Sequence, residues 1–372
     1  MAIWWKLKRE AKRLGKQVNN LGGRVGAHLR RTKYDKIERQ SAHETAGSQP
    51  LGPDIAIILI YQPDGLLAST FWQLEQLNLR GVTPFLVSNH TIKDEDRDKL
   101  IPLCHLILER PNLGFDFGGY RDGILTVIDR GLTPERLFIL NDSVWFPLNS
   151  NCTLIEDARA ATADLFGIFY KTRDRDAGDP QLQSYFYRFN ATMLRDPRFE
   201  RYWRSMPLYN DKEQLNRECS VKLAGIFQAM GYHIDTLVHP QNVIAAADRL
   251  SDVEFNDVAQ FYASTSLRGQ SIFSPLTEIN TDDPEWSKAR EHATHDCRLR
   301  YYFTDSHPMI LMRELQAPFL KKSTEYQYHR QRAALVEQGW HMQFDPIVAQ
   351  EVATWNACNP ASQPESPDFP AL

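Results

Sequence analysis

Residues able to hold a phosphorylated sugar gather in one stretch of the chain, between positions 112 and 143. The stretch opens with a glycine-dense segment that also carries Asn, Asp and Arg: Asn112-Leu113-Gly114-Phe115-Asp116-Phe117-Gly118-Gly119-Tyr120-Arg121-Asp122-Gly123. An apolar run further along ends in Asn141-Asp142-Ser143. Glycine lets backbone N–H groups approach anionic oxygens, and a carboxylate at the end of a strand can hold a divalent cation against a diphosphate. The pattern therefore predicts a site for a phosphate-activated sugar donor.

These two segments resemble the rhamnan synthesis protein F family of glycosyltransferases, whose members show an Asn-x-Gly-x-Asp-x-Gly segment and a Leu-Asn-Asp-Ser strand end. Further pieces are similar in the same order along the chain: Gln183-Ser184-Tyr185-Phe186, Glu218 in a helix-like run that ends at Gly231-Tyr232, and Pro318-Phe319-Leu320-Lys321. The resemblance extends from about residue 54 to residue 322. It implies a GT-A-like α/β fold, a nucleotide-activated donor such as dTDP-rhamnose, and a role in building bacterial surface polysaccharide such as O-antigen.

The resemblance places the donor on both segments. Asp142 would bind Mg²⁺ or Mn²⁺ against the leaving diphosphate, with His239 completing the cation site. The motif supplies one carboxylate where GT-A enzymes commonly have an acidic pair, which puts metal dependence in question. Asp116 would accept from a nucleobase or ribose hydroxyl, and Arg121 would pair with phosphate. The expected donor-binding residues are Asn112, Gly114, Asp116, Gly118, Gly119, Arg121, Asn141, Asp142 and Ser143.

Structural explanations compete with these roles. Asp142 could be a cap that ends a strand, and the glycines could form a tight turn before a helix. The glycines match neither the dinucleotide-binding order nor a P-loop.

An inverting transferase also needs a base that deprotonates the acceptor hydroxyl. Glu218 is the expected base because it matches the family's helix motif, with Asp179, Asp211 and Glu213 as alternatives; a solvated helix face is the ordinary explanation for such a residue. Gln183, Ser184 and Tyr185 are expected to bind the acceptor sugar, unless they belong to an aromatic strand of the core.

The elements that must position these residues alternate between strand and helix. Strands are expected at residues 55–61, 84–88, 105–108 and 137–140, with helices at 66–79, 93–100 and through 124–130. This order predicts a mostly parallel sheet flanked by helices, with ligands at the carboxyl ends of its strands. Further strands are expected at 165–170, 185–190 and 234–238, and residues 171–180 as a mobile lid.

Composition divides the 372 residues into four expected regions. Residues 1–50 form a basic amphipathic arm and linker, 51–250 the GT-A-like domain, 251–345 a mixed, mainly helical C-terminal extension, and 346–372 a disordered tail.

The arm is the most basic part of the chain. Residues 1–40 hold twelve Lys or Arg against Glu10, Asp35 and Glu38, a charge of +9, so the rest of the −4 chain carries −13. With Trp4 and Trp5 in front, the arm suits the surface of an anionic bilayer, where a lipid-linked glycan acceptor would be found. A solvated arm and a helix docked on the protein itself are the alternatives. The acidic body argues against nucleic-acid binding.

Other function classes find no support in the sequence. Five separated cysteines indicate reduced thiols, and the longest apolar run of the body is too short to span a bilayer. His292, His295 and Cys297 lack a second ligand pair. The sequence thus predicts a rhamnosyltransferase-type enzyme of the cytoplasm, peripheral on the cytoplasmic face of the inner membrane. The alternative is a non-catalytic membrane-surface scaffold that keeps a degenerate donor pocket.

Overall fold

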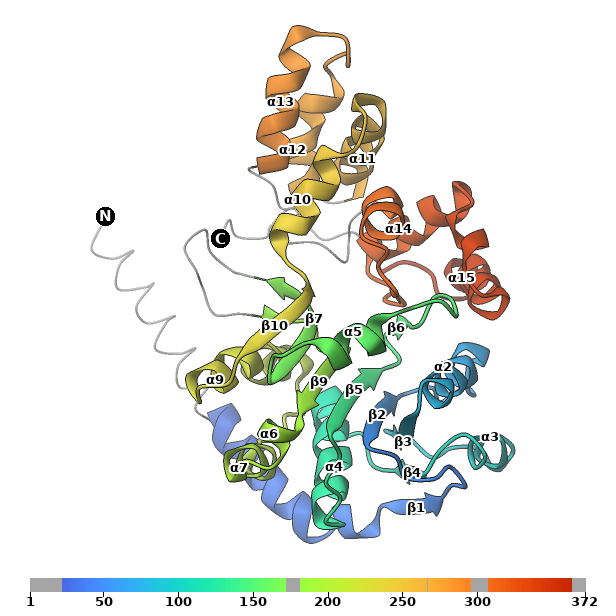
Figure 1. Ribbon diagram of the computed structural model, residues 1–372, viewed down its shortest axis with the longest axis vertical. Coiled ribbons are helices and arrows are strands. Elements are labelled where there is room, and N and C mark those ends of the chain that lie inside the picture. Colours follow the sequence, from blue (N-terminus) through green and yellow to red (C-terminus); the bar gives the residue numbers. More distant parts are fainter. Residues whose placement is uncertain (1–21, 172–180, 266, 296–306, 363–372) are drawn as a thin grey trace, which may run out of the picture. The chain divides into compact units, whose positions relative to one another are not determined.

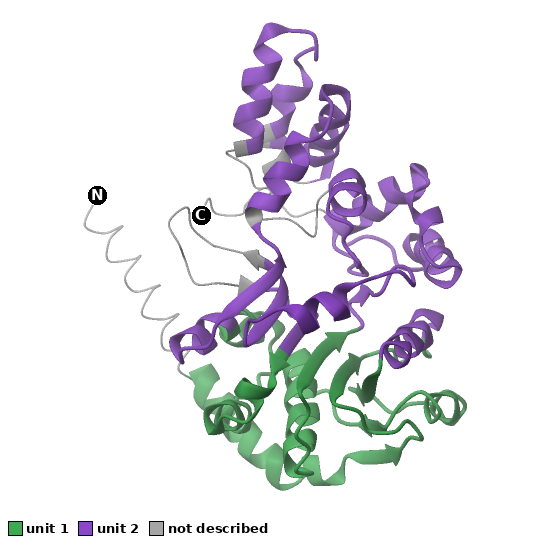
Figure 2. Cartoon of the chain, viewed as in Figure 1, with its two compact units in different colours: residues 1–66, 81–141, 189–223 green, residues 67–80, 142–188, 224–372 purple. Residues whose placement is uncertain are grey.

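The computed structural model describes residues 22–171, 181–265, 267–295 and 307–362, in two compact units (Figures 1 and 2). Unit 1 comprises residues 1–66, 81–141 and 189–223, and unit 2 comprises residues 67–80, 142–188 and 224–372. The fold is α/β, with a large, mostly parallel sheet flanked by helices, as the sequence predicted. The expected division into consecutive regions bounded at residues 50, 250 and 345 differs from these units, because each unit is assembled from separate stretches of chain.

Unit 1 is built on strands in the order β1-β4-β3-β2-β5. Strands β2, β3, β4 and β5 are mutually parallel, and β1 is antiparallel to β4. Every residue of β2 and β3 is buried, as expected of parallel strands covered on both faces. The strands are β1 (His43–Ala46), β2 (Asp54–Ile60), β3 (Val82–Ser88), β4 (Leu106–Glu109) and β5 (Arg136–Asn141). The last four confirm the sequence prediction.

The described part of the basic arm belongs to the body of unit 1. Residues 22–36 are helical, and Ala27 and Tyr34 are buried. The structure therefore favours the docked-helix alternative for this part, while residues 1–21 lie outside the described residues. The predicted linker was wrong for residues 43–46, because β1 pairs there with β4. This strand is short, polar and mostly exposed, so it has no apolar alternation by which it could be recognised.

Helix α4 of unit 1 contains most of the glycine segment. Helix α4 begins at Phe115, so the helix expected through 124–130 is present but starts earlier, and the tight turn expected of the glycines was wrong for residues 115–119. Besides the helix at residues 22–36, the helical elements of unit 1 are η1 (Arg39–Ser41), α3 (Asp94–Leu100), α4 (Phe115–Asp129), α6 (Ala191–Leu194), α7 (Pro197–Ser205), α8 (Lys212–Leu215) and the π-helical η2 (Asn216–Ser220).

Two glycines let α4 lie directly on the sheet. A Cβ atom at Gly119 would stand 2.2 Å from Leu59 Cδ1 of β2, and one at Gly123 would stand 2.6 Å from Ile57 Cγ2. Glycines four residues apart face the same side of a helix. Much of the glycine density is thus explained by close helix–sheet packing.

Unit 2 holds the remaining elements, except that the last two residues of β9 and the first residue of α9 belong to unit 1. In it β7 pairs in parallel with β10 and antiparallel with β8, and β11 pairs antiparallel with β6. The strands are β6 (Val144–Trp145), β7 (Leu165–Lys171), β8 (Gln181–Leu182), β9 (Phe186–Asn190), β10 (Ile234–Val238) and β11 (Leu320–Lys321). The helical elements are α2 (Ala68–Leu79), α5 (Leu154–Ala160), α9 (Leu223–Ala229), α10 (Pro240–Asp248), α11 (Asp252–Thr265), α12 (Leu267–Thr277), α13 (Pro284–His295), η5 (Met309–Glu314), α14 (Tyr326–Glu337), η6 (Trp340–Gln343) and α15 (Pro346–Cys358).

The C-terminal part of unit 2 has a well-packed core. Val348 and Val352, one helical turn apart on α15, are buried in a cluster with Trp72, Trp145 and Leu335. The prediction of a disordered tail from residue 346 was therefore wrong for residues 346–358; residues 363–372 lie outside the described part. Pro346 occupies the first turn of the helix, where proline is well tolerated, and the Asp345 carboxylate caps it.

We expect Gly119→Ala to lower the free energy of unfolding by about 1–3 kcal/mol, because the added methyl group must displace Leu59 from a tightly packed interface. Chemical denaturation of the variant and the wild type measures the difference. Gly22→Ala is the matched control, since a Cβ atom at this helical glycine meets nothing within 4 Å. Equal stability of Gly119→Ala and wild type would show that the helix can shift to accept the methyl group.

Candidate functional site

The strand order of unit 1 creates a point where a ligand can bind. The chain runs outward from β2 through β3 to β4, then returns by α4 to β5 on the other side of β2 (Figure 1). In open parallel sheets, ligands bind outside the carboxyl ends of the strands at such a reversal. The carboxyl ends here are followed by Tyr61, Asn89, Arg110 and, after Asn141 of β5, by Asp142.

The glycine turn follows β4 at this edge. Asn112 is exposed, and Gly114 adopts a left-handed conformation with φ of 78° as the N-cap of α4. Phe115 also has a positive φ, 46°. Gly118 approaches the backbone of this turn, since its Cβ would stand 2.1 Å from the Leu113 carbonyl oxygen. Gly114 and Gly118 thus shape the turn itself, whereas Gly119 packs on the sheet.

Arg121 is engaged by protein groups. It is 1% exposed, and its Nη1 and Nη2 each donate to the Asp35 carboxylate at 2.7 Å. Its Nε donates to the Trp203 carbonyl oxygen at 2.9 Å. A phosphate contact from Arg121 would require these bonds to open, and that role stays a prediction. Asp116, the other charged candidate of the segment, is half-buried in the first turn of α4.

The end of β5 is tied to α4. Asn141 is buried, and its Nδ2 donates to the Tyr120 hydroxyl at 2.7 Å. The next two residues, Asp142 and Ser143, are half-buried and belong to unit 2. The Ser143 carbonyl oxygen accepts from the backbone N–H of Lys322 at 2.9 Å. Burial lowers the pKa of Lys322, and the charges of Asp142 and Glu351 partly offset that effect.

The predicted cation site does not fit these residues. A buried lysine ammonium acts electrostatically on Asp142, whereas a cation site concentrates negative ligands. His239 Nε2 lies 3.0 Å from Asp235 Oδ1. In the described part of the chain, no three His, Cys, Asp or Glu residues are grouped so that they could hold a metal ion.

Glu218 lies in a cluster of ion pairs in unit 1. Its Oε2 accepts from Arg24 Nη2 at 2.6 Å and from Lys222 Nζ at 2.8 Å, and its Oε1 accepts from Arg217 Nε at 3.3 Å. Burial raises the pKa of Glu218, but the hydrogen bonds from Lys222, Arg24 and Arg217 outweigh it and lower the pKa to about 2. A general base works best with a pKa near the operating pH. The environment is therefore that of a structural carboxylate, and the catalytic role stays a prediction.

The expected acceptor residues lie in unit 2, in the turn between β8 and β9. Gln183 and Ser184 are half-buried and the Tyr185 side chain is buried. The Tyr185 ring packs 5.0 Å from that of Phe319, and Lys321 Nζ lies 4.4 Å from its centroid. Tyr185 thus serves the core, while Gln183 and Ser184 keep some access to solvent.

A cavity of about 570 Å³ lies at the carboxyl ends of β3 and β4 in unit 1. Its lining includes Asn89, His90, Arg97, Glu109 and Arg110. None of these was among the residues predicted from the sequence. A signal was present, because Asn89 directly follows the strand expected at 84–88 and Arg110 comes two residues after the one expected at 105–108, as Asp142 does after the next.

Comparison with known proteins identifies the family. The model of the family "Rhamnan synthesis protein F" matches residues 84–266, which contain the glycine turn, the end of β5 and Glu218. Uncharacterized protein y4gN of Sinorhizobium fredii (strain NBRC 101917 / NGR234) is 37% identical over 94% of this chain and 92% of its own length. The chain belongs to the rhamnan synthesis protein F family. Membership of the rhamnan synthesis protein F family supports a glycosyltransferase.

More distant similarities are partial or weak. Virulence protein VirA of Vibrio anguillarum is 28% identical over 39% of this chain, which matches about half (46%) of VirA. Among solved structures, the mannosyltransferase PcManGT from Pyrobaculum calidifontis, in complex with GDP-Man and Mn²⁺, is 13% identical over 94% of this chain and 91% of its own, with a TM-score of 0.34. TarS residues 1–349 from S. aureus are 12% identical over 78% of this chain and 94% of the TarS chain, with a TM-score of 0.28.

The ion pairs of Glu218 predict a pH-dependent loss of stability. Because the pKa of Glu218 is lower in the folded than in the unfolded protein, its contribution is complete above the unfolded pKa of about 4.3 and is lost as the pH falls toward 2. We expect Glu218→Gln to lower the melting temperature at pH 7, with a difference that shrinks below pH 4. Glu213→Gln, at an exposed position of α8, is the control. An unchanged melting temperature combined with lost transfer would instead identify Glu218 as the base.

Proposed function

We propose that the protein transfers rhamnose from a nucleoside diphosphate to a lipid-linked glycan, within a GT-A-like architecture. The observation that carries the proposal is that the family match includes the polar residues at the strand reversal of unit 1. Family membership supports the reaction class, and the position of these residues supports the place of the donor. The sugar, the nucleotide dTDP and the acceptor rest on the resemblance alone.

Three parts of the donor would meet different groups. We place the nucleoside in the cavity beside Asn89 and His90, which offers hydrogen-bonding groups at the strand ends. The diphosphate would lie by the Asn112–Gly114 turn, where the N-terminus of the 15-residue α4 favours negative charge. Asp142 and Ser143 would accept hydrogen bonds from sugar hydroxyls.

Transfer with inversion would need a base near the acceptor. The acceptor oxygen would lose its proton, form a bond to the anomeric carbon and expel the nucleoside diphosphate, with Gln183 and Ser184 holding neighbouring hydroxyls. Glu218 could take that proton only if its ion pairs opened. Among the alternatives, Asp211 caps α8 by accepting from Gln214 N, Glu213 is exposed, and Asp179 lies outside the described residues.

A non-catalytic scaffold is the second candidate. It is favoured by the engagement of Arg121 and Glu218 with protein groups, which leaves neither ready for chemistry in this conformation. Donor hydrolysis or transfer by the purified protein distinguishes the two. A protein that binds a nucleoside diphosphate but never releases sugar from the intact donor would be the scaffold.

Asp142→Asn tests the centre of the proposed donor site. The change preserves size and removes the charge, so we expect binding of dTDP-rhamnose to weaken by about tenfold, roughly 1.4 kcal/mol, with transfer reduced further. Calorimetric titration in EDTA and again with Mn²⁺ measures the affinity. Asp282→Asn, at an exposed loop position of unit 2, is the control. Wild-type affinity and wild-type turnover in Asp142→Asn would make Asp142 a strand-end cap.

The basic segment ahead of the docked helix is proposed to bind an anionic membrane surface. No helix in the described residues is long and apolar enough to cross a bilayer. Residues 2–21 hold Trp4, Trp5 and six Lys or Arg against Glu10. Each basic residue near an anionic surface contributes about 1 kcal/mol.

We expect a protein lacking residues 2–21 to lose binding to phosphatidylglycerol vesicles, while its melting temperature stays that of the full chain. The deletion stops before residue 22 because residues 22–36 are part of unit 1. Co-sedimentation with vesicles measures binding, and neutral phosphatidylcholine vesicles are the control. Equal co-sedimentation of both proteins with the anionic vesicles would exclude this segment as the attachment site.

A further inference from the structure

The buried guanidinium of Arg110 bonds the backbone of the Asn112–Gly114 turn. Arg110, the residue after β4, has a fully buried side chain. Its Nη2 donates to the Leu113 carbonyl oxygen at 2.6 Å, inside the turn. Its Nη1 donates to Asn89 Oδ1 at 2.5 Å, and Asn89 Nδ2 donates to the Phe115 carbonyl oxygen at 3.2 Å. Arg110 and Asn89 together therefore bond the backbone on both sides of Gly114.

The other side of Arg110 is fixed by two groups from different parts of the chain. Its Nε donates to Asp122 Oδ2 of α4 at 2.6 Å and to the Tyr34 hydroxyl oxygen at 3.1 Å. The Tyr34 hydroxyl donates to the same Asp122 oxygen at 2.5 Å. Burial raises the pKa of Tyr34, and the charge of Asp122 adds to this effect, so the hydroxyl keeps its proton and remains a donor.

Tyr34 is held in place because the helix at residues 22–36 makes hydrogen bonds to other parts of unit 1. Asp35 pairs with Arg121, Arg31 Nη1 donates to the Ser205 carbonyl oxygen at 2.7 Å, and Arg30 Nε donates to the Leu208 carbonyl oxygen at 3.1 Å. Tyr34 itself is completely buried. The N-terminal helix is thus positioned by contacts that do not involve the glycine turn.

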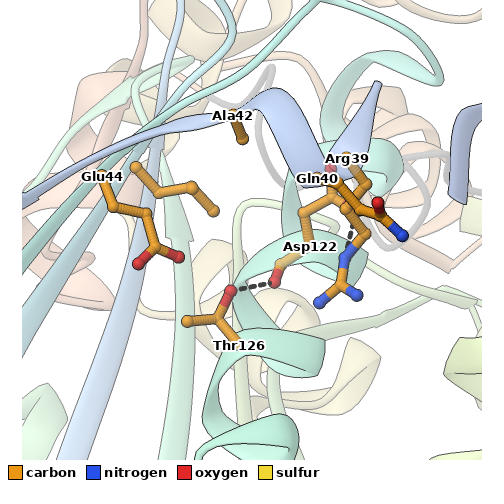
Figure 3. Close-up of a pocket in the computed structure, with 7 residues that line it drawn as sticks. Arg39, Gln40, Ala42, Glu44, Asp122 and Thr126 are labelled. Carbon is orange, nitrogen blue, oxygen red and sulfur yellow. Dashed lines mark hydrogen bonds and ion pairs between the residues drawn. The ribbon is translucent and has the colours of Figure 1, made fainter. Parts of the chain in front are cut away.

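Asp122 is also contacted by Arg39 of η1. Figure 3 shows Asp122 between Arg39, whose Nε lies 3.6 Å from Asp122 Oδ1, and Thr126, whose hydroxyl donates to the Asp122 carbonyl oxygen at 2.8 Å. A cavity of about 410 Å³ opens there, lined also by Gln40 and Glu44. The carboxylate, in the middle of α4, is therefore held by Tyr34 and by Arg110, Arg39 and Arg121, whose Nη1 lies 3.4 Å from Asp122 Oδ1, and it cannot turn away from Arg110 without leaving several donors unpaired.

We propose that Arg110 is a positioning residue for the donor turn, and that the N-terminal helix completes its coordination through Tyr34. The inference rests on the proposed function, since the turn is taken to bind the donor. Residues 22–36 are then part of the machinery that fixes donor affinity. A buried guanidinium that loses one partner is held less firmly, so a change at Tyr34 reaches the Leu113 carbonyl through a single side chain and loosens the turn.

Tyr34→Phe tests the inference while keeping the packing of the ring. We expect amide hydrogen exchange at residues 113–115 to be about tenfold faster and binding of dTDP, UDP or GDP, whichever the wild type binds, to be about tenfold weaker, with kcat for transfer nearly unchanged. Arg110→Lys, which keeps the charge but lacks the planar fork, should show the same pattern more strongly. Tyr209→Phe, which removes a buried hydroxyl of unit 1 that interacts with Arg24, is the matched control.

The two readouts separate the inference from the proposed function. Hydrogen exchange needs no ligand, so faster exchange at residues 113–115 in Tyr34→Phe supports the positioning role even if the wild type binds no nucleoside diphosphate, a result that would defeat the proposed function instead. Wild-type exchange at these residues in Tyr34→Phe, or faster exchange in Tyr209→Phe to the same extent, would overturn the inference. If Tyr34→Phe does not fold, as judged by its circular dichroism, the same readouts in Arg110→Lys decide.

Discussion

The direct contact of helix α4 with strand β2 is the constraint on which the site of unit 1 depends. Gly119 and Gly123 remove the side chains that would hold the helix away from Leu59 and Ile57. With the axis fixed at that distance, Tyr120 reaches Asn141 at the end of β5. The next two residues of α4 bond the N-terminal helix: Arg121 donates to Asp35, and Asp122 accepts from Tyr34. One helix therefore links the glycine turn, the end of β5 and the N-terminal helix.

Electrostatics explains why so many charged residues of unit 1 are buried or half-buried. Arg110 pairs with Asp122, and the pair of Arg121 and Asp35 joins the N-terminal helix to α4. At the surface, Asp129 pairs with both Arg39 of η1 and Arg204 of α7. Removing one member of a buried pair leaves the other charge desolvated and is strongly destabilising. The buried residues Arg110, Arg121 and Asp122 are consequently poor candidates for chemistry, even where their type and position in the sequence suggest it.

The family assignment and the geometry answer different questions. Membership of the rhamnan synthesis protein F family supports a glycosyltransferase, and the geometry shows which polar residues lie at the strand ends. Asp142 and the Asn112–Gly114 turn keep positions compatible with a donor site, whereas Arg121 and Glu218 are held by several protein partners each. Helix α15 of the C-terminal core lies outside residues 84–266, the segment that the family model matches. Lys322 also lies outside that segment, and its charge interacts with that of Asp142.

The sequence by itself determined the parallel strands of unit 1, their order with the helices and the strand end at Asn141, because buried strands are continuous apolar runs and turns between them are polar. It also determined the family, since the glycine segment and the Asn-Asp-Ser strand end are local patterns. Tertiary structure alone decided that Gly119 and Gly123 serve packing, that Arg121 and Glu218 pair with Asp35 and with Arg24, and that α15 is folded. Such outcomes depend on partners distant in sequence: 86 residues separate Arg121 from Asp35, and 194 separate Glu218 from Arg24. A glycine, an arginine or a glutamate carries the same local signal whether its neighbour in space is a ligand or another part of the chain, so only the folded arrangement can distinguish the two.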